Sequence, residues 1–169
     1  MDKETLLKTV EEKLKAEFGG GLISSEVLYD YPVFTVNHDI IEDVVKFLYN
    51  DSELAFQYLT SLAGLHYPDN HGKELGVMYQ LHNLPLNLRI RIKIFFNINH
   101  PVVPTITTVF SAANWMERQE YDFYGIVFSG HPNLKRILNM DDMHAHPMRK
   151  EFPLEDGTRD DKDDKMFGR

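Results

Sequence analysis

The chain has 169 residues, which fits one domain or one domain with a tail, and its 43% hydrophobic content is enough for a folded core. The formal net charge of −8 argues against a nucleic-acid-binding protein, because such proteins neutralise phosphates with an excess of Lys and Arg. The absence of cysteine excludes a disulfide framework, a cysteine-ligated zinc and an iron–sulfur cluster ligated by this chain. No apolar run is long enough to span a membrane and no signal peptide is recognisable, so we expect a cytosolic domain that meets a membrane only through partners.

The first part of the chain predicts a helix followed by two strands. Apolar residues recur at helical spacing up to Phe18, with Lys and Glu on the opposite face, and the glycines at 19–21 then end the helix. The segments 23–31 and 33–36 have the composition of strands, and Pro32 predicts the turn between them.

A second helix is predicted by its cap and its apolar stripe. Asp39 and Glu42 have the spacing of a capping box, in which each side chain accepts a hydrogen bond from the backbone at the start of the helix. The apolar stripe that follows runs to about Asn50. The segment 54–66 fits both helical and strand periods, and we interpret it as a short helical start followed by a strand that ends near Tyr67.

Two later segments, 75–81 and 87–96, alternate between apolar and polar residues and predict half-buried strands joined as a hairpin through 83–87. The second strand has the clearest pattern, because its polar face carries only cations at alternate positions: Arg89, Arg91 and Lys93. In an acidic protein such a stripe indicates a solvated strand face or a contact with an acidic partner, and phosphate binding is the weaker interpretation.

Helices at two places among strands that pair with their sequence neighbours predict an α+β fold of two layers. We expect a mostly antiparallel sheet covered by helices on one face, followed by an extended C-terminal tail. The domain is placed at 1–146 and the charged tail at 147–169, because the sequence after Pro153 holds too few apolar residues to fold alone.

A third helix, from about Ala112 to Tyr124, carries aromatic residues on every side. Four charged residues fall between these aromatics rather than on a separate polar face: Glu117, Arg118, Glu120 and Asp122. One interpretation is a surface helix whose charges reach the solvent. The other is a helix wedged between its own sheet and a partner, with charges paired across the contact; an Arg118–Asp122 pair within the helix would also fit the i, i+4 spacing.

Several residues invite a chemical interpretation. Glu117 and Glu120 could be paired carboxylates for acid–base catalysis, but nothing in the sequence supplies the concave site that such a pair needs. His131 lies between Gly130 and Pro132, which restrict its backbone, so it is a candidate metal ligand or proton carrier. We prefer to interpret it as a hinge that directs the next segment.

His144 and His146, with Asp141 and Asp142 nearby, are the best metal-ligand candidates. Their short spacing in a loop separates the rings and no distant third ligand is identifiable, so a solvated or partner-contacting loop is the preferred interpretation. The sequence contains no G-x-S-x-G, P-loop or G-x-G-x-x-G motif, so acyl transfer, NTP hydrolysis and dinucleotide binding lack support.

The run that starts at Trp115 closely resembles the thirty-kilodalton subunit family of respiratory complex I, which in bacteria is the C subunit of NADH–quinone oxidoreductase. That family has the pattern W-x-E-R-x-x-[YW]-D-x-[FY]-G-I-x-F-x-G-H-P-x-L-[RK]-R-I-L, which is matched here by Trp115, Glu117, Arg118, Tyr121, Asp122, Tyr124, Gly125, Ile126, Phe128, Gly130, His131, Pro132, Leu134, Lys135, Arg136, Ile137 and Leu138. The later run HPMRKEF, at 146–152, matches the family's H-P-[LM]-R-K-[DE]-[FY]-P.

The resemblance implies a cofactor-free structural subunit of the peripheral arm, on the cytoplasmic side of the cell membrane. The complex would pass electrons from NADH to quinone with proton translocation, while FMN, the iron–sulfur clusters and the quinone site belong to partner subunits. The chain would brace the homologue of the forty-nine-kilodalton subunit, the D subunit in bacteria, and would have no catalytic site of its own.

The residues expected at this partner interface are those of the motifs and the apolar points of the tail: Trp115, Glu117, Arg118, Tyr121, Asp122, Tyr124, His131, Pro132, Arg136, His146, Arg149, Lys150, Phe152 and Phe167. Three alternatives stay open. They are an equivalent subunit of a membrane-bound hydrogenase-type complex, a small His-ligated metalloprotein, and an adaptor unrelated to respiration.

Overall fold

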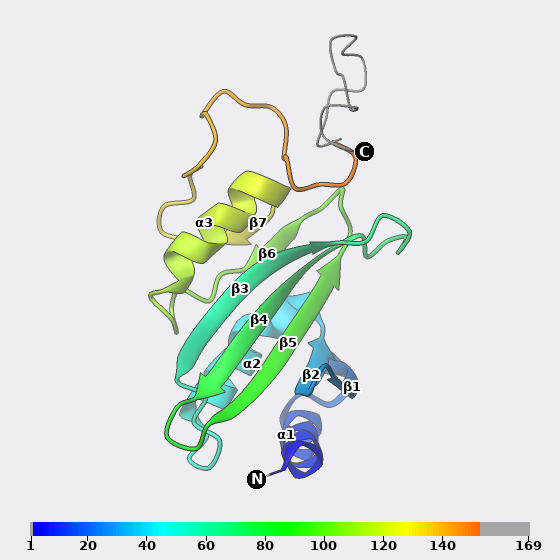
Figure 1. The fold of residues 1–169 in the computed structure, drawn as a ribbon, viewed down its shortest axis with the longest axis vertical. Helices are drawn as coiled ribbons and strands as arrows, with labels where there is room; N and C mark the ends of the chain where they lie inside the picture. The colour runs from blue at the N-terminus through cyan, green and yellow to red at the C-terminus, as the bar shows by residue number, and fades with distance from the viewer. Residues whose placement is uncertain (1, 153–169) are drawn as a thin grey trace, which may run out of the picture.

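The structure, a computed structural model, describes residues 2–152 and is built on a five-stranded sheet (Figure 1). Its strands lie in the order β1-β2-β5-β4-β3, and every neighbouring pair is antiparallel except β2 and β5. The bounds are β1 (Leu22–Leu28), β2 (Tyr31–Val36), β3 (Tyr58–His66), β4 (Leu75–Asn83) and β5 (Leu88–Phe96). The predicted α+β fold with a mostly antiparallel sheet is confirmed.

Three α-helices pack on one face of this sheet: α1 (Lys3–Phe18), α2 (Ile41–Asn50) and α3 (Ala113–Tyr124). Their buried side chains join those of the strands in a single apolar core, and Figure 1 shows α2 behind the sheet. Two short 3-10 helices, η1 (Gly19–Gly21) and η2 (His38–Ile40), precede β1 and α2.

The hairpin of β4 and β5 confirms the alternating pattern seen in the sequence. The two strands pair without a shift from Leu75 opposite Phe96 to Asn83 opposite Leu88. On β5 the apolar residues at alternate positions from Leu88 to Phe96 are buried. On the opposite face Arg89 is exposed, and Arg91, Lys93 and Phe95 are half-buried. A period of two residues predicts this strand well because one of its faces is buried in the core and the other is partly exposed to solvent.

The turn predicted at Pro32 is wrong by two residues. The chain turns at Tyr29 and Asp30, which both have positive φ, and Pro32 lies inside β2. Proline is tolerated there because β2 pairs with β5 only from Val33 onward, so the missing N–H removes no ladder hydrogen bond on that side.

Two predicted helix starts are also corrected. The capping box is absent: Asn37 accepts the backbone N–H of Asp39 at 3.5 Å, and Glu42 instead pairs with Lys46. The expected helical start near residue 54 is a turn held by the Asp51 carboxylate, because short acidic side chains compete with the helix for backbone N–H groups.

A second, two-stranded parallel sheet was not predicted. It pairs β6 (Val102–Pro104) with β7 (Val127–Ser129), and α3 is the connection between the two strands. Strands of three residues are too short to show a period, so no pattern in the sequence marks them. This small sheet fixes both ends of α3 relative to the loop that follows β6, which positions the residues of the candidate site.

Candidate assembly surface

The three acidic residues of α3 are buried. Glu117 and Asp122 are 0% exposed and Glu120 is 2% exposed, whereas Trp115 of the same helix is 65% exposed. An amphipathic helix normally buries its aromatic residues and exposes its acids. The reversed arrangement of α3 needs hydrogen-bond donors from other parts of the chain.

Glu117 is held by the loop that follows β6. Its carboxylate accepts hydrogen bonds from the hydroxyl of Thr105 and from the backbone N–H of Ile106, the latter at 2.8 Å. His131 Nε2 lies 4.0 Å from Glu117 Oε2. Burial raises the pKa of Glu117 to about 7, since these hydrogen bonds offset only part of the desolvation.

Glu120 contacts the edge strand of the main sheet. Its Oε2 accepts the backbone N–H of Gly64 in β3 at 2.7 Å, and burial raises its pKa to about 7. A Cβ atom at Gly64 would come within 2.5 Å of both Glu120 Oε2 and Tyr124 Cδ2. A glycine inside this strand therefore allows α3 to approach closely enough for the hydrogen bond.

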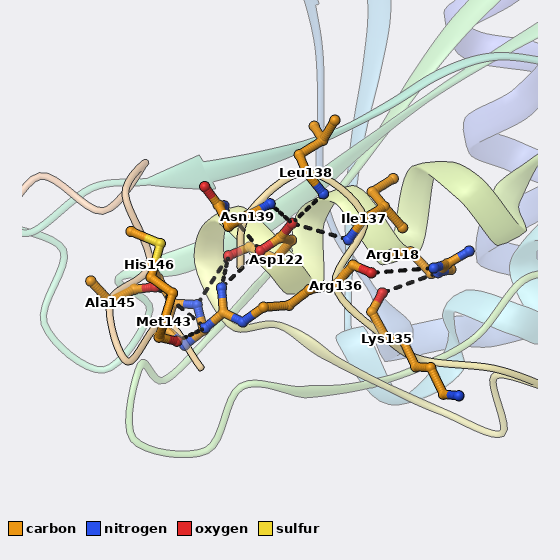
Figure 2. A network of polar contacts seen from close by, with 10 residues as sticks. All are labelled: Arg118, Asp122, Lys135, Arg136, Ile137, Leu138, Asn139, Met143, Ala145 and His146. Atoms are coloured by element: carbon orange, nitrogen blue, oxygen red, sulfur yellow. Dashed lines mark hydrogen bonds and ion pairs between the residues drawn. The ribbon is translucent and has the colours of Figure 1, made fainter. Parts of the chain in front are cut away.

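Asp122 is the centre of a different kind of network, shown in Figure 2. One carboxylate oxygen accepts the backbone N–H groups of Ile137, Leu138 and Asn139 at 2.9–3.2 Å. The other accepts the Arg136 guanidinium at 2.7 Å and the Asn139 amide at 3.0 Å. Burial by itself raises the pKa of Asp122, but these hydrogen bonds outweigh it and hold the pKa well below its usual value.

We call residues 130–152 the strap, because this segment has no helix or strand and lies against α3 and the end of β3. Two arginine side chains, one on α3 and one on the strap itself, donate hydrogen bonds to its backbone carbonyl groups. Arg118 on α3 donates to the carbonyl oxygens of Lys135 and Arg136 at 3.0 and 3.3 Å. Arg136 itself donates to the carbonyls of Met143 and Ala145, so one guanidinium joins Asp122 to two parts of the strap.

The strap begins at a fixed histidine. The side chain of His131 is fully buried, its Nε2 lies 3.1 Å from the carbonyl oxygen of Asn114, and its Nδ1 accepts the N–H of Asn133 at 3.0 Å. The preceding Gly130 has φ 82, and Pro132 is exposed. This geometry fits the predicted hinge, since both ring nitrogens orient the chain between α3 and the strap.

The end of the strap packs on the C-terminus of α3. His146 Nδ1 lies 3.2 Å from the carbonyl oxygen of Asp122, and Arg149 donates to the carbonyl of Tyr124 at 2.7 Å. Burial, together with the charges of Arg149 and Arg136, lowers the pKa of His146. Gly125, with φ 72, ends α3 in the left-handed conformation beneath this contact.

Hydrogen bonds to the domain continue to Lys150, whose backbone N–H donates to His66 Nδ1 at 2.9 Å. The boundary that we predicted between residues 146 and 147 therefore falls inside a segment that contacts the domain. Residues 153–169 of the predicted tail, including Phe167, lie outside the described residues.

Several apolar side chains of α3 and the strap remain at the surface. Trp115 stacks with Arg118, whose guanidinium carbon is 5.0 Å from the ring centre. Leu138 is 63% and Met140 is 72% exposed, and Phe152 is also exposed. We call α3 and the strap together the assembly surface. Hydrogen bonds to buried side chains hold its backbone, and apolar side chains are exposed on it.

The structure brings most of the predicted interface residues together, although it changes their roles. Tyr121 and Tyr124 are half-buried on α3, and Lys150 is exposed on the strap. The Arg118–Asp122 pair within α3 is wrong, because Asp122 pairs with Arg136 and Arg118 binds carbonyl groups. With their side chains buried in this chain, Glu117 and Asp122 can act on a partner only through the segments that they position.

Sequence reasoning missed the residues that satisfy the buried acids, namely Thr105, Ile106, Gly64 and Asn139. A glycine inside an apolar strand was the one signal in the sequence, and it could have pointed only to Gly64. As for metal binding, no group of three or more His, Asp or Glu side chains within residues 2–152 could hold a metal ion. His144 is exposed, whereas His146 is half-buried against α3.

The comparison with known protein families is decisive. Residues 34–158 match the family described as respiratory-chain NADH dehydrogenase, 30 kDa subunit. The chain belongs to this family. The resemblance found in the sequence is therefore confirmed, and α3 and the whole strap lie inside the matched range.

Curated relatives carry the name of the same subunit. The C subunit of NADH-quinone oxidoreductase from Methylobacterium sp. (strain 4-46) is 38% identical over 148 residues, which cover 88% of this chain and 68% of that protein. The C subunit from Mycolicibacterium paratuberculosis is 34% identical over 154 residues, 89% of this chain and 66% of that protein. The chain thus spans about two thirds of the length of these 30 kDa subunit relatives.

Solved structures share the fold. The structure described as Nqo5 of the trypsin-resistant fragment (1-134) has 26% sequence identity and a TM-score of 0.63, and it covers 79% of this chain and 100% of its own. A chain of the membrane-bound sulfane sulfur reductase, an archaeal respiratory membrane complex, has a TM-score of 0.71 at 23% identity over 89% of this chain and 85% of its own. Among the helices of residues 2–152, none is both long and apolar enough to cross a membrane.

Proposed function

We propose that this chain is a cofactor-free structural subunit in the peripheral arm of an NADH–quinone oxidoreductase, where it braces the homologue of the forty-nine-kilodalton subunit. The parent complex would carry electrons from NADH to quinone and couple this to proton translocation. FMN, the iron–sulfur clusters and the quinone would be bound by partner subunits, on the cytoplasmic side of the membrane. Membership of the 30 kDa subunit family and the names of the relatives support this proposal.

The observation that carries the bracing role is the construction of the assembly surface. The strap has no regular secondary structure, yet five hydrogen bonds from it to the Asp122 carboxylate hold its first half in one conformation. Its side chains Leu138 and Met140, together with Trp115 of α3, stay exposed. A surface that is ordered before binding loses less conformational entropy on association, so exposed anchors on a fixed backbone favour docking.

The composition of the surface fits a protein partner. Tryptophan and arginine are the residues that most often dominate binding energy in protein interfaces, and here Trp115 and Arg118 are stacked together. The buried charges of the surface are satisfied within the chain, so a partner need not supply a counter-charge for them. This replaces the expectation that the charges of α3 pair across the contact.

The test is direct binding of the purified chain to the purified homologue of the forty-nine-kilodalton subunit from the same organism. We expect Trp115→Ala to weaken binding about 100-fold, the size of an interface anchor, with an unchanged melting temperature. Leu84→Ala is the matched control, because Leu84 is 57% exposed in the turn between β4 and β5, away from the assembly surface. Equal effects of the two substitutions, or no binding by the unaltered chain, would refute the proposal.

A second candidate is the equivalent subunit of a membrane-bound complex with another electron donor. The same fold in a chain of the archaeal membrane complex favours this candidate as the alternative. Identifying by mass spectrometry the subunits that co-purify with the tagged chain from its own host separates the two. An NADH-oxidising flavoprotein is expected for the first, and a hydrogenase-type subunit in its place for the second.

A further inference from the structure

The face of the main sheet opposite the helices has its own set of side chains. Val33 is only 1% exposed, yet it is not part of the apolar core, and Leu65, Met78 and Phe95 are half-buried without packing on that core. Strand register places these residues on the face that α1, α2 and α3 leave uncovered. We call it the open face.

The middle of the open face is cationic. Arg89, Arg91 and Lys93 lie at alternate positions of β5, which is the third of the five strands in the sheet order. Neighbouring members of such a row are about 7 Å apart, so the three charges repel one another. Within residues 2–152, none of the three takes part in an ion pair.

The nearest acid in the register is too far away to neutralise this row. Glu26 on β1 is opposite Val33, and Val33 is opposite Arg91, so two strand spacings, about 10 Å, separate the backbones of Glu26 and Arg91. Most charged residues of the chain are acidic, with 26 Asp and Glu against 18 Lys and Arg. A row of cations in the centre of one face is therefore a local reversal of sign.

The central cation is already held in place. The guanidinium carbon of Arg91 lies 4.2 Å from the centre of the Tyr31 ring, and its Nε donates to Gln80 at 3.3 Å. The cross-strand neighbours of Arg91 are Gln80 and Val33, and Met78 and Phe95 lie further along the same face. An arginine stacked on an aromatic ring is typical of an interface centre rather than of a solvated strand face.

Both ends of the cationic row open into hollows. At the turn between β4 and β5, Arg89 lines a hollow of about 470 Å³ together with Tyr29 and Asn87. Asp30 also lines this hollow, where it is paired with Lys3 at 2.6 Å. Beyond Phe95, a hollow of about 460 Å³ is lined by Tyr67, by Asp69 and by Lys150 of the strap. The cationic face is thus continuous at one end with the assembly surface, which gives an elongated shape suited to an extended segment.

We propose that the open face is a second docking surface, which binds an extended acidic segment of a partner polypeptide along β5. Carboxylates of that segment pair with Arg89, Arg91 and Lys93, and its apolar side chains contact Met78 and Phe95. This inference rests on the proposed function only in that the partner belongs to the same assembly. It is independent of the contact made by α3.

The experiment is zero-length carbodiimide crosslinking of the purified assembly, which joins a lysine amine to a carboxylate in direct contact, followed by mass spectrometry. We expect Lys93 to be joined to an Asp or Glu of another polypeptide of the assembly, and Lys93→Arg to remove this crosslink while the polypeptides still co-purify. A crosslink of Lys93 only to residues 153–169 of its own chain, or to a second copy of this chain, would overturn the proposal. So would a Lys93 that is not crosslinked while other lysines of the assembly are.

A binding measurement provides the second readout. Reversing two charges in the double variant Arg89→Glu/Lys93→Glu is expected to weaken association with the crosslinked partner about tenfold and to reduce its salt dependence. Unchanged affinity would overturn the proposal. If Trp115→Ala disrupts binding to the forty-nine-kilodalton homologue while the double variant has no effect, only the open-face inference fails. If the chain co-purifies with no oxidoreductase subunits, the proposed function fails instead.

Discussion

Helix α3 buries acids on two of its sides, and the hydrogen-bond donors around them differ between the two sides. Asp122 accepts hydrogen bonds from three backbone N–H groups, an amide and an arginine, so its carboxylate is stabilised in the ionised form. Glu117 and Glu120 are as deeply buried, but among residues 2–152 neither forms an ion pair with a lysine or an arginine. Their pKa values rise to about 7, while that of Asp122 falls.

The contrast shows that burial does not determine the charge of a carboxyl group. The number of donors and the presence of a counter-charge decide whether the desolvation cost is offset. The difference has a structural counterpart. The ionised acid holds the irregular strap, and the two acids with raised pKa values lie where α3 meets regular strands and the loop after β6. Substitutions and pH can disturb each side of this contrast separately.

Replacing Asp122 by Ala should have the largest effect. The change leaves the Arg136 guanidinium and three strap N–H groups without their acceptor, and breaking such a buried pair costs about 3–5 kcal/mol. We expect this loss in the free energy of unfolding by urea at pH 7, together with faster proteolysis near residues 137–139. Asp141→Ala is the control, because Asp141 is exposed on the same strap and should change stability by less than about 0.5 kcal/mol. Equal effects would refute an anchoring role for Asp122.

Raising the pH should destabilise the domain through Glu117 and Glu120. Their folded pKa of about 7 lies above the ordinary value of 4.5, so their contribution to stability is complete below pH 4.5 and is lost as the pH rises through 7. Each group can account for about 2–3 kcal/mol across this range, which urea unfolding at a series of pH values would measure. Asp122 has the opposite sign, but its lowered pKa places its effect below pH 3.8. Stability that is constant between pH 4.5 and 8 would contradict this prediction.

Glu120→Gln isolates one of these groups. A glutamine keeps an oxygen for the N–H of Gly64 and cannot ionise, so it should raise the free energy of unfolding at pH 8 by about 2 kcal/mol and change it little at pH 4.5. Glu4→Gln is the control, because Glu4 is exposed in the first turn of α1. If Glu120→Gln and the unaltered protein have the same free energy of unfolding at both pH values, the raised pKa of Glu120 is wrong.

Gly125→Ala should have a smaller effect, at the contact between α3 and the strap. Its φ of 72 is unfavourable for alanine, and a Cβ atom there would lie 2.6 Å from His146 Nε2 and 2.9 Å from an Arg149 nitrogen. Gly72→Ala is a matched control with φ 81 and no atom within 4 Å, so it carries the backbone cost alone. We expect Gly125→Ala to cost about 1 kcal/mol more than the control in urea unfolding. Equal losses in the free energy of unfolding for the two variants would show that the strap does not pack closely against Gly125.

Much of the fold follows from periodicity. The alternation in β5, the hairpin with β4 and the bounds of α3 to within one residue were predicted because local burial has a period that the sequence displays. The strands β6 and β7 were missed because three residues are too few to display an alternating pattern. The turn near residue 54 was mistaken for a helix because the Asp51 cap is a hydrogen bond, not a pattern.

The orientation of α3 was beyond the reach of periodicity. The acids are buried because Gly64, Ile106 and the strap supply hydrogen-bond donors to them, and these donors are separated from the acids by up to 56 residues. Hydrophobicity alone assigns acids to the solvent. The family motif located the right residues, but it could not show that Asp122 pairs with Arg136 inside the chain.

The most direct test of the contrast within α3 is a titration of its carboxyl carbons by NMR. With ¹³C-labelled protein between pH 3.5 and 8.5, the side-chain carbonyl resonances of Glu117 and Glu120 should each shift with a midpoint about 7. That of Asp122 should stay at the chemical shift of an ionised carboxylate over the whole range. Midpoints of about 4 for all three groups would contradict the contrast, since they would show that these acids are solvated and that none of them is held as the structure describes.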